Sequence, residues 1–357
     1  MPHSLTPAGG PHHLAVVGSG LSGLAVAYHA AQRPGCTVEL FDPVTPGLGG
    51  ASALAALMHP HSPRGRLIWR GKEGVAASLL LLDFAERFSD RGESVFYGKG
   101  RAIRRPCLNA GHVSMFEQAA RSLPGLITLT QDPYTNFGAA VLHSSYVINT
   151  PVYLKSLFRG LHREFPVNRV DKSVSREELG SLRRMYDHVI ICAGAGLVGL
   201  VEGVEPRVTL VRGQNVIFED PDGQRLETAR ICGEYVIPVE GHRILCGATH
   251  EYSRDEMHSP PDLTSALETL SPSLTKIFPP LKACTPLQAA AGVRVAARRT
   301  HLGKIPLIGR HPDFENVCFL TGLGSHGLVH HALMAKLLVA AIFDEDGFNT
   351  LPTEVRF

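Results

Sequence analysis

The feature that most constrains this chain is a glycine-rich turn between two short apolar segments near its N-terminus. The three glycines of VVGSGLSG stand at GxGxxG spacing: Gly18, Gly20 and Gly23. Around them, residues 14–17 predict a buried parallel strand, residues 24–32 a helix, and residues 37–41 a second strand. The first glycine permits the tight turn, the second lets the backbone approach a pyrophosphate, and the third lets helix and strand pack closely. The unit therefore predicts a Rossmann-type dinucleotide site.

Other residues of this unit are candidates for binding the same ligand. Leu21 and Ser22 stand at the expected helix N-terminus, where free N–H groups and the positive end of the helix dipole favour phosphates. Asp42 ends the second strand, 19 residues after Gly23, where its carboxylate is placed to accept hydrogen bonds from ribose hydroxyls. The motif alone leaves both FAD and NAD open.

Length and composition indicate a two-domain globular protein. The chain has 357 residues, of which 44% are hydrophobic, and a net charge of +2, which implies no strong electrostatic field. Seven cysteines, none of them in a CxxC pair, are expected to be reduced thiols. No apolar run reaches the roughly 18 residues of a membrane span. Residues 1–13 predict a disordered lead-in without signal-peptide features. We expect a soluble protein of the cytoplasm or of an organellar stroma or matrix.

Three buried strands that each end in a glycine cluster organise the rest of the chain. The first of the three is the strand at 14–17. The strand predicted at 186–192 precedes Ala193–Gly196, and the strand predicted at 317–320 precedes Gly322–Gly327. Helical patterns cover 71–88, 151–165, 265–278 and, as a closing amphipathic helix, 330–343, whereas 288–298 fits a helix or a strand. The predicted fold class is α/β: a discontinuous Rossmann-type domain with a second, mainly antiparallel β-sheet domain. The first is assigned residues 14–75, 145–205 and 290–357, and the second residues 76–144 and 206–289.

Five further motifs follow one another in a characteristic order. They are LGGASALAALMHP at 48–60, VRGQ at 211–214, YVIPVEGHRILCGAT at 235–249, AGVRVAARRTHLGKIPLIG at 291–309 and TGLGSHGL at 321–328. In this order they resemble the motifs of the D-amino-acid oxidase-like (DAO) family of FAD-dependent oxidoreductases, and the resemblance covers essentially residues 14–345. It implies that the cofactor is FAD, that the second domain binds the substrate, and that the reaction oxidises a C–N bond.

The resemblance also implies which residues hold the flavin. Gly50, Ala51 and Ser52 match a segment that wraps the pyrophosphate, and Ala193 and Gly194 match a strand end near the ribityl chain and phosphates. The last turn is similar to one where a helix N-terminus faces the pyrimidine end of the flavin and stabilises its negative charge. That turn contributes Gly322, Gly324, Ser325, His326, Gly327 and Leu328.

Three residues are implied at the substrate, each with a plain alternative. Arg294 in AGVR matches an arginine that binds a substrate carboxylate, for which two parallel hydrogen bonds suit a guanidinium; a buried structural arginine is the alternative. Tyr235 matches a tyrosine beside the substrate, or is a core aromatic. His59, after the GGAS segment, meets substrate or flavin, or is a loop histidine, and His61 is a weaker candidate.

The substrate remains open between several classes. GLGSHGL and ALMHP are close to segments of the family's tRNA wobble-uridine oxidases, which oxidise an N-carboxymethyl amine. His326 departs from the arginine usual there, and Leu245 and Cys246 occupy the stretch where sarcosine oxidases place a lysine. Three hypotheses follow. The first is an oxidase of a carboxylated amine, which is either a free amino acid (glycine or a D-amino acid) or a modified tRNA. The second is a dehydrogenase that uses an acceptor other than oxygen, and the third is a non-enzymatic flavoprotein assembly factor.

A basic segment around the single tryptophan is a candidate RNA contact. Trp69 stands among Arg64, Arg66, Arg70 and Lys72, and such a pattern grips RNA through phosphates and stacking, or is a solvated loop. Further arginines that would extend a basic patch are Arg101, Arg104, Arg105, Arg298 and Arg299. The histidine pairs His12–His13 and His330–His331 have no carboxylates at metal-ligand spacing, so no metal site is expected.

Overall fold

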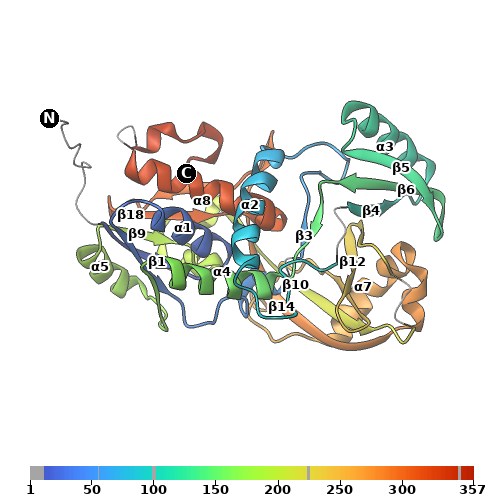
Figure 1. The fold of residues 1–357 in the computed structure, drawn as a ribbon, viewed down its shortest axis with the longest axis horizontal. Coiled ribbons are helices and arrows are strands. Elements are labelled where there is room, and N and C mark those ends of the chain that lie inside the picture. The colour runs from blue at the N-terminus through green and yellow to red at the C-terminus, as the bar shows by residue number, and fades with distance from the viewer. Residues whose placement is uncertain (1–11, 55, 99–101, 223–225, 345–346) are drawn as a thin grey trace.

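The glycine turn ends the central strand of a six-stranded sheet with the order β17–β18–β9–β1–β2–β8 (Figure 1). The computed structural model describes residues 12–54, 56–98, 102–222, 226–344 and 347–357. All neighbouring strands are parallel except β17 and β18. The strands are β1 His12–Val17, β2 Cys36–Phe41, β8 Val167–Val170, β9 His188–Ile191, β17 Leu307–Arg310 and β18 Val317–Thr321.

Helices cover both faces of this sheet, which is why β1 is apolar at four successive positions, 14–17. In β1, Leu14 and Val16 point into a core with the helices of one face, and Ala15 and Val17 into a core on the other. The first face carries α1 Leu21–Ala31, α2 Gly71–Glu86, α4 Thr150–Glu164 and α8 Gly327–Phe343; the second carries α5 Arg176–Met185 and α6 Leu197–Leu200. The N-terminal unit is therefore a Rossmann-type layer, as predicted.

Two helix predictions need correction. Helix α1 begins at Leu21, three residues before the predicted start, so Gly23 lies inside its first turn. The closing helix begins at Gly327 and is not amphipathic, because it packs between α1 and α2 and is buried on nearly all sides. Within the described ranges, Gly324–Phe343 is the one helical stretch long and apolar enough to cross a membrane, and 67% of its 18-residue apolar window is buried inside the protein.

The second sheet has eight strands in the order β14–β10–β13–β12–β11–β4–β6–β5. All pairs are antiparallel except β11 with β4. Helix α7, Leu263–Ile277, packs on one half and α3, Ala110–Ser122, on the other (Figure 1). The strands are β4 Ala102–Pro106, β5 Ile127–Asp132, β6 Thr135–His143, β10 Val208–Glu219, β11 Arg230–Cys232, β12 Glu234–Val239, β13 Arg243–Gly247 and β14 Thr285–Ala297. Two short pairs remain: β3 Leu57–Met58 with β7 Tyr146–Val147, and β15 Arg299–Thr300 with β16 Gly303–Lys304.

Two elements run across the domain bounds expected from the sequence. The bound between residues 75 and 76 falls inside α2, whose buried side chains pack with α4 and α8. The bound at 290 falls inside β14, which pairs with β10 along its length and shows that residues 288–297 of the segment 288–298 are strand. We therefore propose that the Rossmann layer includes the whole of α2 and that β14 belongs to the second sheet.

The start of the described chain also differs from expectation. Residues 1–11 of the predicted lead-in lie outside the described residues, whereas His12 and His13 already belong to β1. The backbone N–H of His12 donates to Gly35 O at 3.0 Å, and the register with β2 begins at His12 and Cys36. The strand is longer than its apolar part because backbone pairing does not require apolar side chains.

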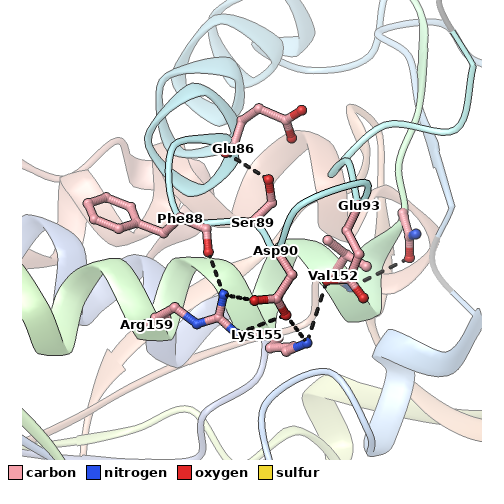
Figure 2. A network of polar contacts seen from close by, with 9 residues as sticks. Glu86, Phe88, Ser89, Asp90, Glu93, Val152, Lys155 and Arg159 are labelled. Atoms are coloured by element: carbon pink, nitrogen blue, oxygen red, sulfur yellow. Dashed lines mark hydrogen bonds and ion pairs between the residues drawn. The ribbon is translucent and has the colours of Figure 1, made fainter.

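The chain that leaves α2 for the second sheet is tied to α4 by charged groups (Figure 2). Asp90 accepts hydrogen bonds from Lys155 Nζ at 2.6 Å and from the two terminal nitrogens of Arg159 at 2.7 and 3.0 Å. Arg159 also donates to the carbonyl of Phe88 at 2.9 Å. These groups are exposed, so the ion pairs orient the connection more than they stabilise the fold.

A buried hydrogen-bonded pair, Tyr153 of α4 and His331 of α8, contacts the start of α8. The hydroxyl of Tyr153 lies 2.8 Å from His331 Nε2, and His331 Nδ1 lies 3.0 Å from the carbonyl oxygen of Gly327. Since a carbonyl only accepts, Nδ1 carries the hydrogen and Nε2 accepts from the tyrosine. His331 is therefore a neutral histidine, and its burial lowers its pKa to about 4.

This histidine predicts a pH-dependent loss of stability. The unfolded chain takes up a proton as the pH falls through the ordinary histidine pKa of about 6.5, whereas folded His331 stays neutral until about pH 4. Its contribution is thus complete above about pH 6.5 and is lost as the pH falls toward 4; by pH 5 the loss is about 2 kcal/mol. In His331→Gln, the fall in unfolding free energy from pH 7 to pH 5 should be smaller by that amount, as measured by denaturant unfolding. Equal falls in both proteins would contradict this assignment.

Candidate active site

A cavity of about 1070 Å³ lies where the Rossmann layer meets the second sheet. Its walls come from the ends of β1, β9 and β18 on one side and from β10, β12 and β14 on the other. The three predicted glycine clusters meet here, although more than a hundred residues separate each from the next. Every cofactor and substrate residue expected from the sequence lines this cavity except Gly23, which lies beneath the turn.

The GxGxxG turn has the shape that a pyrophosphate requires. Gly18 has a φ of +103°, and a Cβ on it would lie 2.5 Å from the carbonyl oxygen of Cys192 at the end of β9. A Cβ on Gly20 would meet no protein atom within 4 Å, so the space above the turn is open to a ligand. Helix α1 has no side-chain cap, and its first N–H groups at Leu21 and Ser22 face the cavity. The turn fits a dinucleotide phosphate.

Gly23→Ala tests the packing beneath this turn. A Cβ at residue 23 would stand 1.8 Å from the carbonyl oxygen of Gly18, so the turn and α1 must separate. We expect a loss of about 1–3 kcal/mol of stability, as for other overpacked sites, and a lower FAD content after purification. Gly180→Ala in α5 is the matched control, because its Cβ would meet no atom within 4 Å. Full FAD occupancy in Gly23→Ala with unchanged stability would contradict the prediction.

Asp42 lines the cavity at the end of β2 and also braces the turn. One carboxylate oxygen accepts from the backbone N–H and the hydroxyl of Ser19 at 2.7 and 2.9 Å, and the other accepts from Val44 N–H at 2.8 Å. A carboxylate has about four acceptor positions, so one remains for a ligand hydroxyl. The ribose contact of Asp42 stays a prediction.

Two further backbone segments close around the cavity beside this turn. Gly50 and Gly194 have positive φ values of +59° and +54°, and a Cβ on either would meet no atom within 4 Å. Ala51 and Ser52 lie in a 3₁₀ turn at 50–54, where the Ser52 hydroxyl donates to the carbonyl of Gly49. With Ala193 they present mostly backbone to the ligand space, which suits a long cofactor held by main-chain groups.

The C-terminal cluster presents a helix N-terminus to the other end of the cavity. Residues Gly324–His326 form a 3₁₀ turn that leads into α8, and α8 has no side-chain cap. Ser325, Gly327 and Leu328 line the cavity with the first N–H groups of α8. Burial lowers the pKa of His326 to about 4, so it is neutral at neutral pH. Neutral His326 and the helix dipole leave this end favourable to a negatively polarised group.

Arg294 and Tyr235 lie together at the wall made by the second sheet. The Arg294 Nη2 donates to the carbonyl of Thr249 at 2.8 Å, while its buried Nε has no partner in the described part of the chain. Burial lowers the pKa of Arg294, which stays cationic at neutral pH. Burial raises the pKa of Tyr235 to about 12, and its hydroxyl shares a hydrogen bond with the Asn215 side chain.

His59 and His61 also line the cavity, where both lie near Arg105 of β4 and His59 lies near His326. His59 keeps part of its surface toward the cavity, whereas His61 is fully buried. The backbone N–H of His61 lies 3.4 Å from His59 Nδ1, which makes Nδ1 the acceptor and leaves the hydrogen on Nε2. Burial lowers the pKa of His59 to about 3 and also lowers that of His61. His59 is thus a neutral hydrogen-bonding group and not a charged one.

The predicted RNA-binding segment divides into an exposed and a packed part. Arg64 and Arg66 are exposed, next to Pro63 at the cavity wall. Trp69 instead packs against the core of the Rossmann layer and near the His330 ring, and Arg70 is paired with Glu73. Stacking of a base on Trp69 is therefore not supported. Arg298 and Arg299 are exposed, and Arg101 lies outside the described residues.

Sequence patterns placed neither His250 nor Arg105 at the cavity. Both line the cavity. His250 follows β13 near Arg294, and burial lowers its pKa. The sequence indicated Arg105 only as an extension of a basic patch, but it lies two residues after buried Ile103 and two before buried Cys107, and this spacing of two indicates an inward side chain. Where the residues are described, no group of three or more metal-ligating side chains occurs.

Comparison with known sequences identifies relatives over nearly the whole chain. A family profile described as "FAD dependent oxidoreductase", named DAO, matches residues 13–341. The bifunctional protein MnmC of tRNA 5-methylaminomethyl-2-thiouridine biosynthesis from Maricaulis maris is 28% identical over 344 residues, 95% of this chain and 53% of that protein. Glycine oxidase of Pseudomonas aeruginosa is 30% identical over 154 residues, 43% of this chain and 40% of that protein. The chain thus spans about half the length of the MnmC relative.

Solved structures share the fold at low sequence identity. Iminodiacetate oxidase from Chelativorans sp. BNC1 superposes with a TM-score of 0.74 at 18% identity, over 96% of this chain and 98% of that one. Glycine oxidase from Geobacillus kaustophilus gives 0.72 at 17% identity, over 92% and 94%. At these identities the likeness establishes the shared mixed α/β architecture.

Proposed function

Because the chain belongs to the DAO family of FAD-dependent oxidoreductases, we propose that it oxidises the C–N bond of a carboxylated amine. The preferred substrate is an N-carboxymethyl amine carried by a modified wobble uridine of tRNA. The observation that carries the proposal is that Arg294, a cation in the cavity, has no anionic partner among the described residues.

Arg294 is a cation held ready for an anion that the protein does not supply. Within the described residues it has no ion pair, since the nearby carboxylate of Glu251 is bound by Arg212, Gln214 and Thr249. Its buried Nε lacks a partner, and leaving such a donor unpaired costs about 1–3 kcal/mol. A substrate carboxylate would satisfy it, and that contact would fix the adjacent carbon in the cavity.

The surrounding groups suit an uncharged reaction centre. When bound, FAD supplies the hydride acceptor. The substrate loses a hydride from carbon and a proton from nitrogen, and water then hydrolyses the imine to an amine and an oxo acid. Tyr235 and neutral His59 can orient the amine by hydrogen bonds without adding charge. No side-chain nucleophile is required.

Two observations favour a large substrate over a free amino acid. The MnmC relative matches over 95% of this chain, and its name assigns it to tRNA modification. The exposed cations Arg64 and Arg66 also flank the cavity wall at Pro63, where they would meet phosphates.

Free glycine is the second candidate. The glycine oxidase relative has the higher identity, 30%, although over only 43% of this chain. Glycine presents one carboxylate and one amine, which Arg294 and the neutral groups beside it would bind equally well.

All seven cysteines are free, and we propose that the protein works in a reducing compartment.

Anaerobic bleaching of the purified yellow protein tests the proposal. Glycine, sarcosine, D-alanine and tRNA carrying carboxymethylaminomethyl-uridine are offered separately, with tRNA lacking the modification as control. Bleaching only by modified tRNA supports the preferred substrate, and bleaching by a small amine supports the second. Admitting oxygen then distinguishes an oxidase, which regains colour and forms peroxide, from a dehydrogenase. No bleaching by any of them would overturn the proposal in favour of a non-enzymatic flavoprotein.

A further inference from the structure

Arg105 places a second guanidinium on the wall of the same cavity. It lies in β4, is 7% exposed, and faces the ligand space. In the strand register, Arg104 lies opposite Arg230 of β11, and Ile231 of β11 lies opposite Tyr235 of β12. Arg105, Ile231 and Tyr235 therefore stand on one face of the sheet, and β4 and β12 are about 10 Å apart because one strand separates them.

No carboxylate neutralises Arg105 in the described residues. Neither an ion pair nor a hydrogen bond of its side chain is found there, and its one aromatic contact is the ring of Phe116 at 5.7 Å. Its other titratable neighbours are the thiols of Cys107 and Cys232 and the imidazoles of His59 and His61. Burial raises the pKa of both thiols and lowers that of both imidazoles, so all four are neutral at neutral pH.

Such an arrangement is costly unless something outside the protein compensates it. A buried cation without a counter-charge loses its hydration and gains little in return. Arg105 and Arg294 moreover line one cavity, whose one carboxylate among the described lining residues is Asp42 at the end of β2, and like charges repel. A ligand with an anionic group at each end would neutralise both.

We propose that Arg105 binds a second anionic group of the substrate, distinct from the carboxylate held by Arg294. The proposal deepens the proposed function and rests on it for the position of the first carboxylate. The anion is a second carboxylate of a free amine or a phosphate next to a modified nucleoside. Both are recognised by a guanidinium through the same pair of hydrogen bonds.

Ligand binding to the oxidised FAD-loaded protein tests this without any turnover. Perturbation of the flavin spectrum gives dissociation constants for glutarate and for butyrate, which differ by one carboxylate, and for a modified anticodon stem–loop RNA and its free nucleoside. A charge-assisted contact predicts that the ligand with the second anion binds wild type about 10- to 100-fold more tightly. In Arg105→Met the preference for glutarate should vanish, or the preference for the RNA should fall by that factor and keep only the part due to exposed cations such as Arg64 and Arg66, while butyrate and nucleoside keep their affinities; Arg105→Lys should restore part of what is lost.

The ligand whose preference is lost in Arg105→Met identifies the source of the anion. Loss of the glutarate preference identifies a carboxylate, and loss of the RNA preference alone identifies a phosphate. Arg104→Met is the matched control, because its side chain lies on the opposite face of β4 and should leave all affinities unchanged. Since Arg105 is uncompensated, Arg105→Met should unfold at the same temperature as wild type or higher.

Two results would overturn the proposal. One is an unchanged preference in Arg105→Met; the other is a fall in its unfolding temperature with loss of FAD, which would mark Arg105 as structural. If no amine bleaches the flavin but the Arg105-dependent preference persists, oxidation of a carboxylated amine is refuted and the second anion site stands. If amines are oxidised and the preference is independent of Arg105, the reverse holds.

Discussion

Arg294→Met is expected to lower kcat/KM for a carboxylated amine by at least about 100-fold, because a charge-assisted, two-point contact to the carboxylate is lost. Methionine keeps the volume of the side chain and the cavity wall, so the flavin content should not change. Steady-state kinetics on whichever substrate bleaches the flavin gives the ratio. Most of the effect should appear in KM if the contact is equal in ground and transition states, and in kcat if it also orients the C–H bond.

Two variants separate a substrate contact from a general charge effect. Arg299→Met removes an exposed arginine five residues along the chain and should leave kcat/KM unchanged. Arg294→Lys keeps the charge but loses the planar pair of donors, and should recover only part of the activity. If Arg294→Met matched wild type on a carboxylated amine, the proposed function would lose the observation that carries it.

Asp132→Ala should destabilise the second sheet by about 3–5 kcal/mol, the cost of stripping one partner from a buried ion pair. Arg230 donates to both carboxylate oxygens of Asp132 at 2.7 and 2.8 Å, and the two side chains are 3% and 0% exposed. The same guanidinium donates to the carbonyl of Ile277 at 2.8 Å and stacks 5.0 Å from the centroid of the Tyr134 ring. It thus joins the end of α7 to the β5–β6 turn, and thermal unfolding should show a clearly lower midpoint.

A double variant and an exposed ion pair make this prediction specific. Arg230→Met combined with Asp132→Ala removes both charges and should regain much of the loss, since the uncompensated cation is gone. Asp90→Ala breaks the exposed contacts to Lys155 and Arg159 (Figure 2) and should change the midpoint little. A large loss at Asp90 with none at Asp132 would reverse this account of what stabilises the two layers. Ile231, next to Arg230, lines the cavity, so Asp132→Ala should also weaken substrate binding.

Local patterns predicted the elements whose signals lie within a few residues. The apolar run and glycine spacing of the first unit, the long leucine run of α2 and the helix that starts at Thr150 depend on neighbours in the chain. Other local signals were present but missed. Ser175 and Glu178 form a capping box at the start of α5, and Asn109 caps α3 by accepting from His112 N–H.

The sequence by itself determined the Rossmann unit, the order of the glycine clusters and most of the glycines and side chains expected at the cavity, because each follows from short-range spacing or from a family motif. Only the tertiary structure decided what those residues face. The burial of His59 and His326, and the position of Arg105 on the same sheet face as Tyr235, arise from segments that meet in the folded protein. The charge and hydration of a group depend on all its neighbours in space, whereas the sequence shows only the residues that precede and follow it.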